Sequence, residues 1–162
     1  MTLLFVAGRT APNRSVRFGG EHDPLDARGR TDVAKLAHHL PRGAALVSGP
    51  ELSVRQSAEI LCVAFDVAPE LATLDVGCWT GVAPEDLDPA ELGGWFADPS
   101  SCPHGGESVV AFLARITSSI RLIDDDAALL VAKPVAQALL CPVAARFFAT
   151  DVRPASVHPR PA

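Results

Sequence analysis

The sequence has no tyrosine and only two lysines, Lys35 and Lys133, so its other positive charges are arginines. The net charge is -5 at pH 7, and no stretch of the chain gathers the lysines and arginines into a basic patch. Proteins that bind a nucleic-acid backbone concentrate positive charge on one face. The scarcity of positive charge therefore argues against a nucleic acid as a partner.

Long hydrophobic runs are also absent. The apolar start at residues 2–7 ends at Gly8 and follows no basic segment, so it is too short for a membrane span and unlike a signal peptide. We therefore expect a cytoplasmic protein without a membrane partner. With 162 residues and 48% hydrophobic content, the chain is long enough for one domain with a sizeable core.

The cysteines and histidines show no metal-ligand spacing. The four cysteines form no Cys-x-x-Cys pair, and the five histidines have no ligand spacing on a shared helix face. The cysteines are Cys62, Cys78, Cys102 and Cys141. We expect free thiols, no metal and no cofactor.

Apolar runs and helical periodicity divide the chain into alternating strands and helices. Buried strands are predicted at residues 2–7, 44–48 and 127–132, with a weaker one at 70–75. The periodic segments predict helices over residues 26–40, 53–65, 89–96, 107–123 and 134–148.

Strands that alternate with helices predict an α/β fold, here a three-layer α/β/α sandwich with a mostly parallel central sheet. We expect one domain over residues 1–150 and a loose tail over 151–162, which contains proline and arginine. The site of such a fold lies at the carboxyl ends of the strands. In this chain those ends lead into the loops that begin at Gly8, Gly49, Val76 and Lys133.

Short motifs occur in a particular order along nearly the whole chain. They are Leu3-Leu4-Phe5-Val6 with Asn13, Arg17-Phe18-Gly19-Gly20, Asp23-Pro24-Leu25-Asp26 with Gly29, Ser48-Gly49-Pro50-Glu51-Leu52-Ser53, Leu74-Asp75-Val76-Gly77-Cys78-Trp79-Thr80-Gly81, and Pro103-His104-Gly105-Gly106-Glu107-Ser108. This order resembles that of the histidine phosphatase superfamily, in its phosphoglycerate-mutase-like branch. The corresponding family patterns are Arg-His-Gly-x-Thr-x-x-Asn, Arg-Phe-x-Gly-x-x-Asp-x-Pro-Leu-Thr-x-x-Gly, Ser-Ser-Pro-Leu-x-Arg-Ala-x-x-Thr-Ala, Leu-Asp-x-Gly-x-Trp-Glu-Gly and Pro-Pro-Gly-Gly-Glu-Ser. The resemblance implies the same α/β sandwich.

The chain departs from the family at the positions that would carry phosphohistidine chemistry. In the alignment that we use, the first loop is one residue shorter than in the family. Ala7 then stands in place of the phosphate-binding Arg, and Gly8 in place of the nucleophilic His. Ser53 replaces the second Arg, Thr73 the proton-donating carboxylate and Lys133 the second His. That chemistry needs an imidazole nucleophile and cationic groups around the phosphoryl group. We therefore predict a degenerate member, a pseudophosphatase whose retained pocket binds a small anionic molecule or a partner.

Residues that remain near this pocket are candidates for a new role. Lys133 and His104 are the candidate acid–base residues. The candidate ligand-binding residues are Arg9, Asn13, Arg14, Arg17, Ser53, Glu107 and Ser108. Lys133 stands between a buried strand and a helix, where desolvation and the helix dipole both disfavour its charged form.

Each assignment has an alternative. Lys133 and Arg9 also fit exposed side chains, His104 fits a surface loop, and Glu107 and Ser108 fit caps of the helix that follows them. A second function is also open, in which Lys133, His104 or Arg9 performs isomerisation, dehydration or cyclisation in a bacterial biosynthetic pathway. Since the chain ends where relatives add further strands, we also expect an open sheet edge and a homodimer through it.

Overall fold

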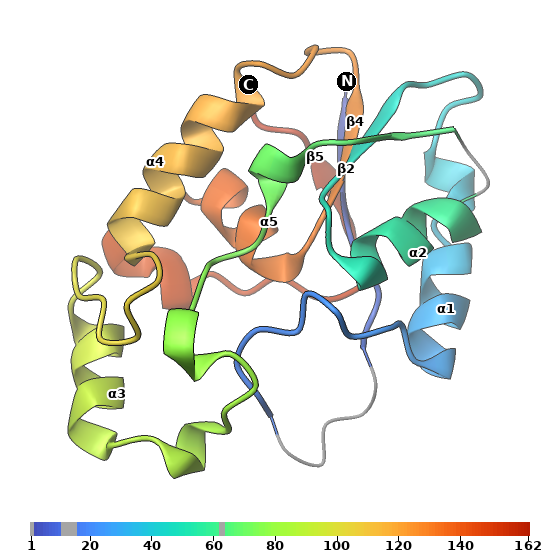
Figure 1. The fold of residues 1–162 in the computed structure, drawn as a ribbon. Helices are drawn as coiled ribbons and strands as arrows, with labels where there is room; N and C mark the ends of the chain where they lie inside the picture. The colour runs from blue at the N-terminus through green and yellow to red at the C-terminus, as the bar shows by residue number, and fades with distance from the viewer. Residues whose placement is uncertain (1, 11–15, 62–63) are drawn as a thin grey trace.

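The computed structural model describes residues 2–10, 16–61 and 64–162. These residues fold around a central sheet (Figure 1). Its strands are β1 (Leu3–Val6), β2 (Leu46–Ser48), β3 (Asp66–Val67), β4 (Ala128–Val131) and β5 (Val157–Pro159). They lie in the order β3-β2-β4-β1-β5. The neighbours among β1 to β4 are parallel, and β5 pairs with β1 antiparallel. The prediction of a mostly parallel sheet is confirmed.

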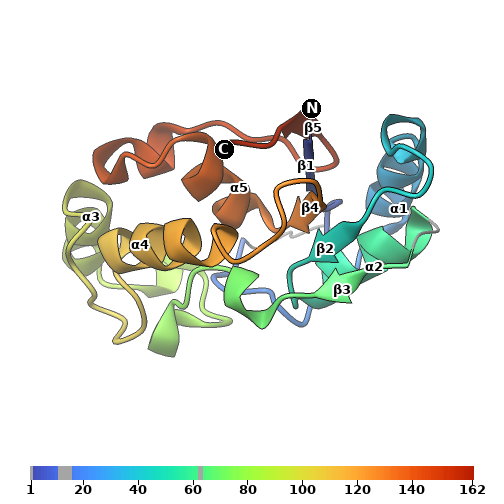
Figure 2. The ribbon, with the colours of Figure 1, turned by 90° about the horizontal axis from the view of Figure 1, so that it is seen from above.

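Helices cover both faces of this sheet (Figure 2). α1 (Ala27–Ala34) and α2 (Leu52–Ile60) lie on one side, and α4 (Val109–Ile120) and α5 (Lys133–Leu140) lie on the other, with α3 (Pro89–Ala97) beyond α4. The short 3₁₀ helices are η1 (Ala37–His39), η2 (Pro69–Leu71), η3 (Gly77–Trp79), η4 (Pro84–Asp86) and η5 (Ala144–Ala149). The predicted three-layer α/β/α architecture is therefore present. None of the described helices is long and apolar enough to cross a membrane.

The two faces of the sheet bury separate apolar clusters, because side chains alternate along each strand. On β1, Leu4 packs into the cluster that includes α4 and α5, whereas Phe5 packs into the cluster that includes α1 and α2. On β4, Leu129 and Leu130 divide in the same way. A strand buried on both faces needs apolar residues at consecutive positions. The continuous apolar runs predict β1 and β4 for this reason.

The prediction of a strand at residues 70–75 is wrong. The edge strand is β3, and Pro69 then starts η2. The carbonyl oxygens of Glu70, Ala72 and Thr73 accept hydrogen bonds from the guanidinium of Arg115 on α4. A side chain from the helical layer therefore satisfies backbone groups that a sheet would otherwise pair.

The final residues are not loose, so the expectation of a loose tail over residues 151–162 is corrected. β5 covers the edge of β1, and the guanidinium of Arg160 donates to the carbonyl oxygens of Ile123, Asp124 and Ala127. Without β5, the buried strand β1 would keep unpaired backbone groups along one edge. The outer strands of the sheet are β3 and β5, and a homodimer through either edge stays a prediction.

α1 lies so close to the loop after β1 that only glycine fits between them. Asp26 caps α1 by accepting a hydrogen bond from the amide of Gly29. A Cβ on Gly29 would lie 2.3 Å from the carbonyl oxygen of Arg9, and one on Gly8 would lie 2.8 Å from the carbonyl oxygen of Gly29. The two glycines let backbone pack directly on backbone beneath this loop.

We expect Gly29→Ala to lower the free energy of unfolding by about 2 kcal/mol or more, because a methyl group has no room against Arg9. Gly93→Ala is the matched control, since Gly93 is also helical and a Cβ there would meet nothing within 4 Å. Alanine at residue 93 should be neutral or stabilise by up to about 1 kcal/mol. Urea denaturation measures both variants, and an equal effect of the two substitutions would contradict the close contact.

Candidate functional site

A cavity of about 410 Å³ opens at the carboxyl ends of β1, β2 and β4, and we call it the main cavity. Its lining residues come from the loops after these strands and from the segment before α1. They are Ala7, Gly8, Arg9, Thr10, Arg17, Gly19, Gly20, Glu21, Asp23, Glu51, Ser53, Thr73, Ala132, Lys133, Pro134 and Pro154. The loops at Gly8, Gly49 and Lys133 meet here because parallel strands end at the same edge of a sheet.

A second cavity, of about 330 Å³, shares Glu21, Glu51 and Thr73 with the main cavity, and we call it the side cavity. Its remaining lining combines apolar and charged residues. They are His22, Pro50, Arg55, Ala72, Leu74, Asp75, Val76 and Thr80. The two cavities are therefore neighbours, with Glu21, Glu51 and Thr73 in the lining of both.

Positively charged side chains reach the main cavity from three elements. Arg9 follows β1, Arg17 precedes α1, and Lys133 is the first residue of α5. All three side chains are exposed, and none forms an ion pair within the described part of the chain. Arg17 is held at one point, since its guanidinium donates to the carbonyl oxygen of Gly81 at 2.7 Å. These groups are free to contact a ligand.

The packing of Gly8 changes how the family pattern fits the first loop. Gly8 is buried with its backbone against Gly29, so this position requires glycine. Placing Gly8 on the glycine of Arg-His-Gly-x-Thr-x-x-Asn also aligns Thr10 and Asn13 with the pattern and needs no shorter loop. In this register Ala7, which lines the main cavity, takes the place of the His, and Val6 takes the place of the Arg. Both this register and the one that sets Ala7 and Gly8 at those two positions stay predictions.

Ser53, in the first turn of α2, lines the main cavity at the position of the second family Arg. Its carbonyl oxygen accepts a hydrogen bond from the hydroxyl of Ser57 at 2.7 Å, and the Ser57 oxygen accepts one from the amide of Gly8 at 3.2 Å. These bonds attach the loop after β1 to α2. Serine carries no charge, so the positive groups among the described lining residues are Arg9, Arg17 and Lys133.

Glu51 is a buried charged residue of the candidate site that the sequence patterns do not single out. It precedes α2, only 4% of it is exposed, and it lines both cavities. Its Oε1 atom accepts a hydrogen bond from the amide of Thr73 at 2.5 Å, whereas Oε2 is buried without a partner among the described residues. The one signal in the sequence is a Glu where the Ser-Ser-Pro-Leu pattern has an apolar residue.

Burial raises the pKa of Glu51, because a carboxylate loses its water there. Hydrogen bonds from the amides of Glu51 and Thr73 oppose this rise. The negative charge of Glu21 adds to it, and the positive charge of Arg115 opposes it. Glu51 therefore gives the site a carboxyl group that takes up a proton more readily than an exposed glutamate.

His104 lies outside both cavities, so the geometry does not place it as an acid or base there. It is 2% exposed and packs edge-on against Trp79 and Trp95. Its Nδ1 atom accepts a hydrogen bond from the amide of Gly106. Burial lowers the pKa of His104, and Asp75 partly opposes this shift. The residue is neither a surface side chain nor part of the cavity lining.

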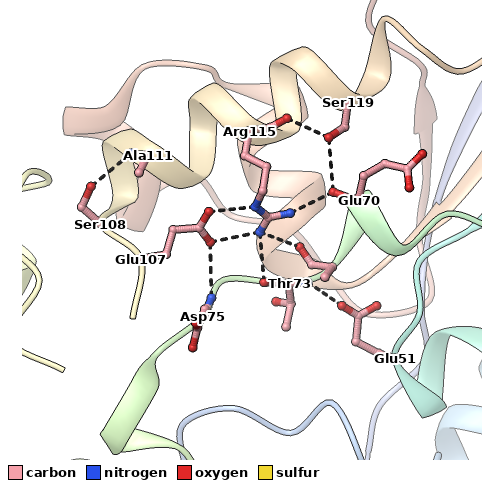
Figure 3. Close-up of polar contacts among 10 residues, drawn as sticks. Glu51, Glu70, Thr73, Asp75, Glu107, Ser108, Ala111, Arg115 and Ser119 are labelled. Carbon is pink, nitrogen blue, oxygen red and sulfur yellow. Dashed lines mark hydrogen bonds and ion pairs between the residues drawn. The ribbon is translucent and has the colours of Figure 1, made fainter. Parts of the chain in front are cut away.

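Glu107 and Ser108 contact protein groups instead of the main cavity (Figure 3). Ser108 caps α4 by accepting from the amide of Ala111, as its alternative interpretation expects. Glu107 accepts two hydrogen bonds from Arg115, at 2.8 Å from Nε and 3.0 Å from Nη2. The other bonds of the Arg115 guanidinium go to the carbonyl oxygens on residues 70–73.

The remaining sequence predictions have mixed outcomes. Asn13, Arg14 and Cys62 lie outside the described residues, whereas Cys78, Cys102 and Cys141 are free thiols. Within the described part of the chain, no group of three or more His, Cys, Asp and Glu residues is placed to hold a metal ion.

The architecture and the position of the main cavity define an α/β protein of the phosphoglycerate-mutase-like class. The family model of the histidine phosphatase superfamily (branch 1) matches residues 3–142, and the chain belongs to this superfamily. No match is found among the curated proteins.

Solved structures share this fold over nearly the whole chain. A phosphoglycerate mutase from Thermus thermophilus is 28% identical with a TM-score of 0.79, and the similarity covers 99% of this chain and 94% of that one. A mycobacterial glucosyl-3-phosphoglycerate phosphatase is 24% identical with a TM-score of 0.76, and it covers 96% of this chain and 87% of that one. The second similarity concerns the fold alone.

We expect Arg115→Ala to lower the free energy of unfolding by about 3 kcal/mol, because Glu107 and the carbonyl oxygens of Glu70, Ala72 and Thr73 lose their hydrogen bonds from the guanidinium. Arg115→Lys should restore little of this loss, since an ammonium cannot reproduce the planar fork of the guanidinium. Arg121→Ala, at the exposed end of the same helix, should change stability by less than about 0.5 kcal/mol. Urea denaturation measures the free energy of unfolding of the three variants. A small effect of Arg115→Ala would contradict a stabilising role of these hydrogen bonds.

His104 should make stability depend on pH. Its pKa in the folded chain is lowered from the ordinary value of 6.5, so the unfolded chain binds a proton at this residue more readily. Its contribution to the free energy of unfolding is complete above pH 6.5 and is lost as the pH falls toward the folded-state pKa. Over this pH range, denaturation should show that the free energy of unfolding falls less in His104→Phe than in the wild type. His38→Asn, an exposed control, should keep the wild-type slope, and equal slopes in all three proteins would contradict the burial effect.

Proposed function

We propose that this chain binds a small organic anion in the main cavity and does not transfer phosphoryl groups through a phosphohistidine. The observation that carries this proposal is that Ala7, the residue that we align with the family's nucleophilic His, lines the main cavity. No histidine lines the main cavity within the described residues, so an imidazole nucleophile is missing there. A methyl group cannot form the covalent intermediate.

The preference for an anion is supported by the free positive groups. Arg9, Arg17 and Lys133 line the cavity without ion pairs among the described residues. α2 and α5 both begin at its edge, and the positive end of a helix dipole favours an anion. Arginine and lysine contact phosphate, sulfate or carboxylate groups through charge-assisted hydrogen bonds.

The side cavity supports a ligand that carries an organic group besides its anionic end. Pro50, Leu74 and Val76 supply apolar surface there, while Glu21 and Glu51 supply carboxyl groups. The names of the structural relatives, a phosphoglycerate mutase and a glucosyl-3-phosphoglycerate phosphatase, refer to phosphorylated small acids. A small organic phosphate or carboxylate therefore fits the two cavities best.

Acid–base catalysis by Lys133, His104 or Arg9 has less support than binding. His104 lies outside the cavities, and the side chain of Lys133 is exposed. The proposed role of Lys133 is that of a positive contact to the anion.

We expect Lys133→Ala to weaken the binding of inorganic phosphate by about tenfold, because a hydrogen bond to a charged group contributes about 1.5 kcal/mol. Lys35→Ala is the matched control, since Lys35 is exposed at the end of α1 and pairs with Asp32. Isothermal titration calorimetry at low salt measures phosphate affinity, and p-nitrophenyl phosphate serves as the turnover substrate. Unchanged affinity in Lys133→Ala, or turnover with a trapped phosphohistidine, would contradict the proposal.

A further inference from the structure

Glu51 occupies the junction of the two cavities and is fixed from two directions. The amide of Thr73 holds Oε1, on the side of α4. On the other side, a Cβ on Gly49 would lie 2.7 Å from Oε2, so the lack of a side chain there leaves the space that this oxygen occupies. The carboxyl group therefore has a defined place in the lining of the main cavity and is not a mobile surface group.

The Oε2 atom of Glu51 needs a hydrogen-bond partner. Buried polar atoms in folded proteins are nearly always hydrogen-bonded, and a buried unpaired carboxylate oxygen is costly. Oε2 has no partner among the described residues although the side chain lines both cavities. Oε2 itself is closed to solvent, so a ligand in the main cavity completes its hydrogen bonding when the lining or the Glu51 side chain shifts to expose this oxygen.

We infer that Glu51 binds the anion as a protonated carboxylic acid, whose Oε2–H group donates a hydrogen bond to an oxygen of the ligand. This inference rests on the proposed anion binding. The proton comes from solvent when the ligand enters and returns to solvent when it leaves, and no covalent bond forms or breaks. Glu51 thereby selects ligands with a strong acceptor oxygen at this point and couples their affinity to pH.

Charged groups of both signs surround Glu51, with the cationic groups in excess. The main cavity contributes Arg9, Arg17, Glu21, Asp23 and Lys133, the side cavity adds His22, Arg55 and Asp75, and Arg115 acts from behind Thr73. Burial raises the pKa of Glu51 before any ligand is present. A bound anion raises this pKa further by repulsion between like charges. Anion affinity should consequently increase as the pH falls through the range in which Glu51 titrates.

Sulfate is a suitable probe, because it stays a dianion while carboxyl groups titrate. We expect the wild type to lose about tenfold or more in sulfate affinity between about pH 5 and pH 8, since one coupled proton changes affinity by at most tenfold per pH unit. Glu51→Gln keeps the shape and supplies a permanent N–H donor, so its affinity should be nearly independent of pH and exceed that of the wild type at pH 8. Glu59→Gln, on the exposed side of α2, should behave as the wild type.

The outcomes separate the two proposals. The absence of sulfate binding in every variant at every pH would overturn the proposed anion site. Sulfate binding with the same pH dependence in wild type and Glu51→Gln would overturn the role of Glu51 alone, because His22 and the other charged groups are common to both proteins. If Glu51→Gln fails to fold, carboxyl ¹³C NMR of the wild type at fixed pH replaces it. Sulfate should then shift one glutamate signal toward its protonated value, and unchanged spectra would contradict the inference.

Discussion

The guanidinium of Arg115 fixes the backbone segment on which the candidate site depends. It binds Glu107 through two nitrogens and the carbonyl oxygens of residues 70–73 through its remaining hydrogens (Figure 3). With that segment in place, the amide of Thr73 reaches Oε1 of Glu51. A helix on one side of the sheet therefore positions a side chain at the start of α2, on the other side. This chain of contacts thus fixes Glu51 and Thr73, two residues of the main cavity's lining.

The same contacts explain how a carboxyl group reaches the site although Thr73 stands at the position of the family's acid. Glu51 comes from another element and binds the backbone amide of residue 73 itself. Its carboxyl group thus lies beside residue 73, in the lining of a cavity that Ala7 also lines. In our proposal, a site with cations, a carboxyl group and no nucleophile holds its ligand without attacking it.

The sequence was sufficient to predict the layers of the fold and the edge of the sheet that carries the site. Continuous apolar runs indicate β1 and β4 because both strands are buried on both faces, and parallel strands bring the following loops together. β3 and β5 are too short for a distinct pattern, and each forms because a neighbouring strand offers an unpaired edge. Residues 70–75 look like a strand, but their partner is a guanidinium that no local pattern reveals.

Individual site residues were harder to predict than their location. Arg9, Arg17, Ser53 and Lys133 line the cavity because they lie in loops or first helical turns at the correct edge of the sheet. The site role proposed for His104 assumed that its motif borders the cavity, whereas Trp79 and Trp95 enclose the imidazole elsewhere. Glu51 became recognisable only through its burial and its unpaired oxygen, which are properties of the three-dimensional structure.

The most direct test of this account is a crystal structure of the protein soaked in tungstate, with the anion located by its anomalous scattering. The account predicts a peak in the main cavity, in contact with Lys133 and the carboxyl group of Glu51 and away from every histidine nitrogen. A tungsten atom bonded to a histidine nitrogen, or a main cavity without a peak, would contradict it.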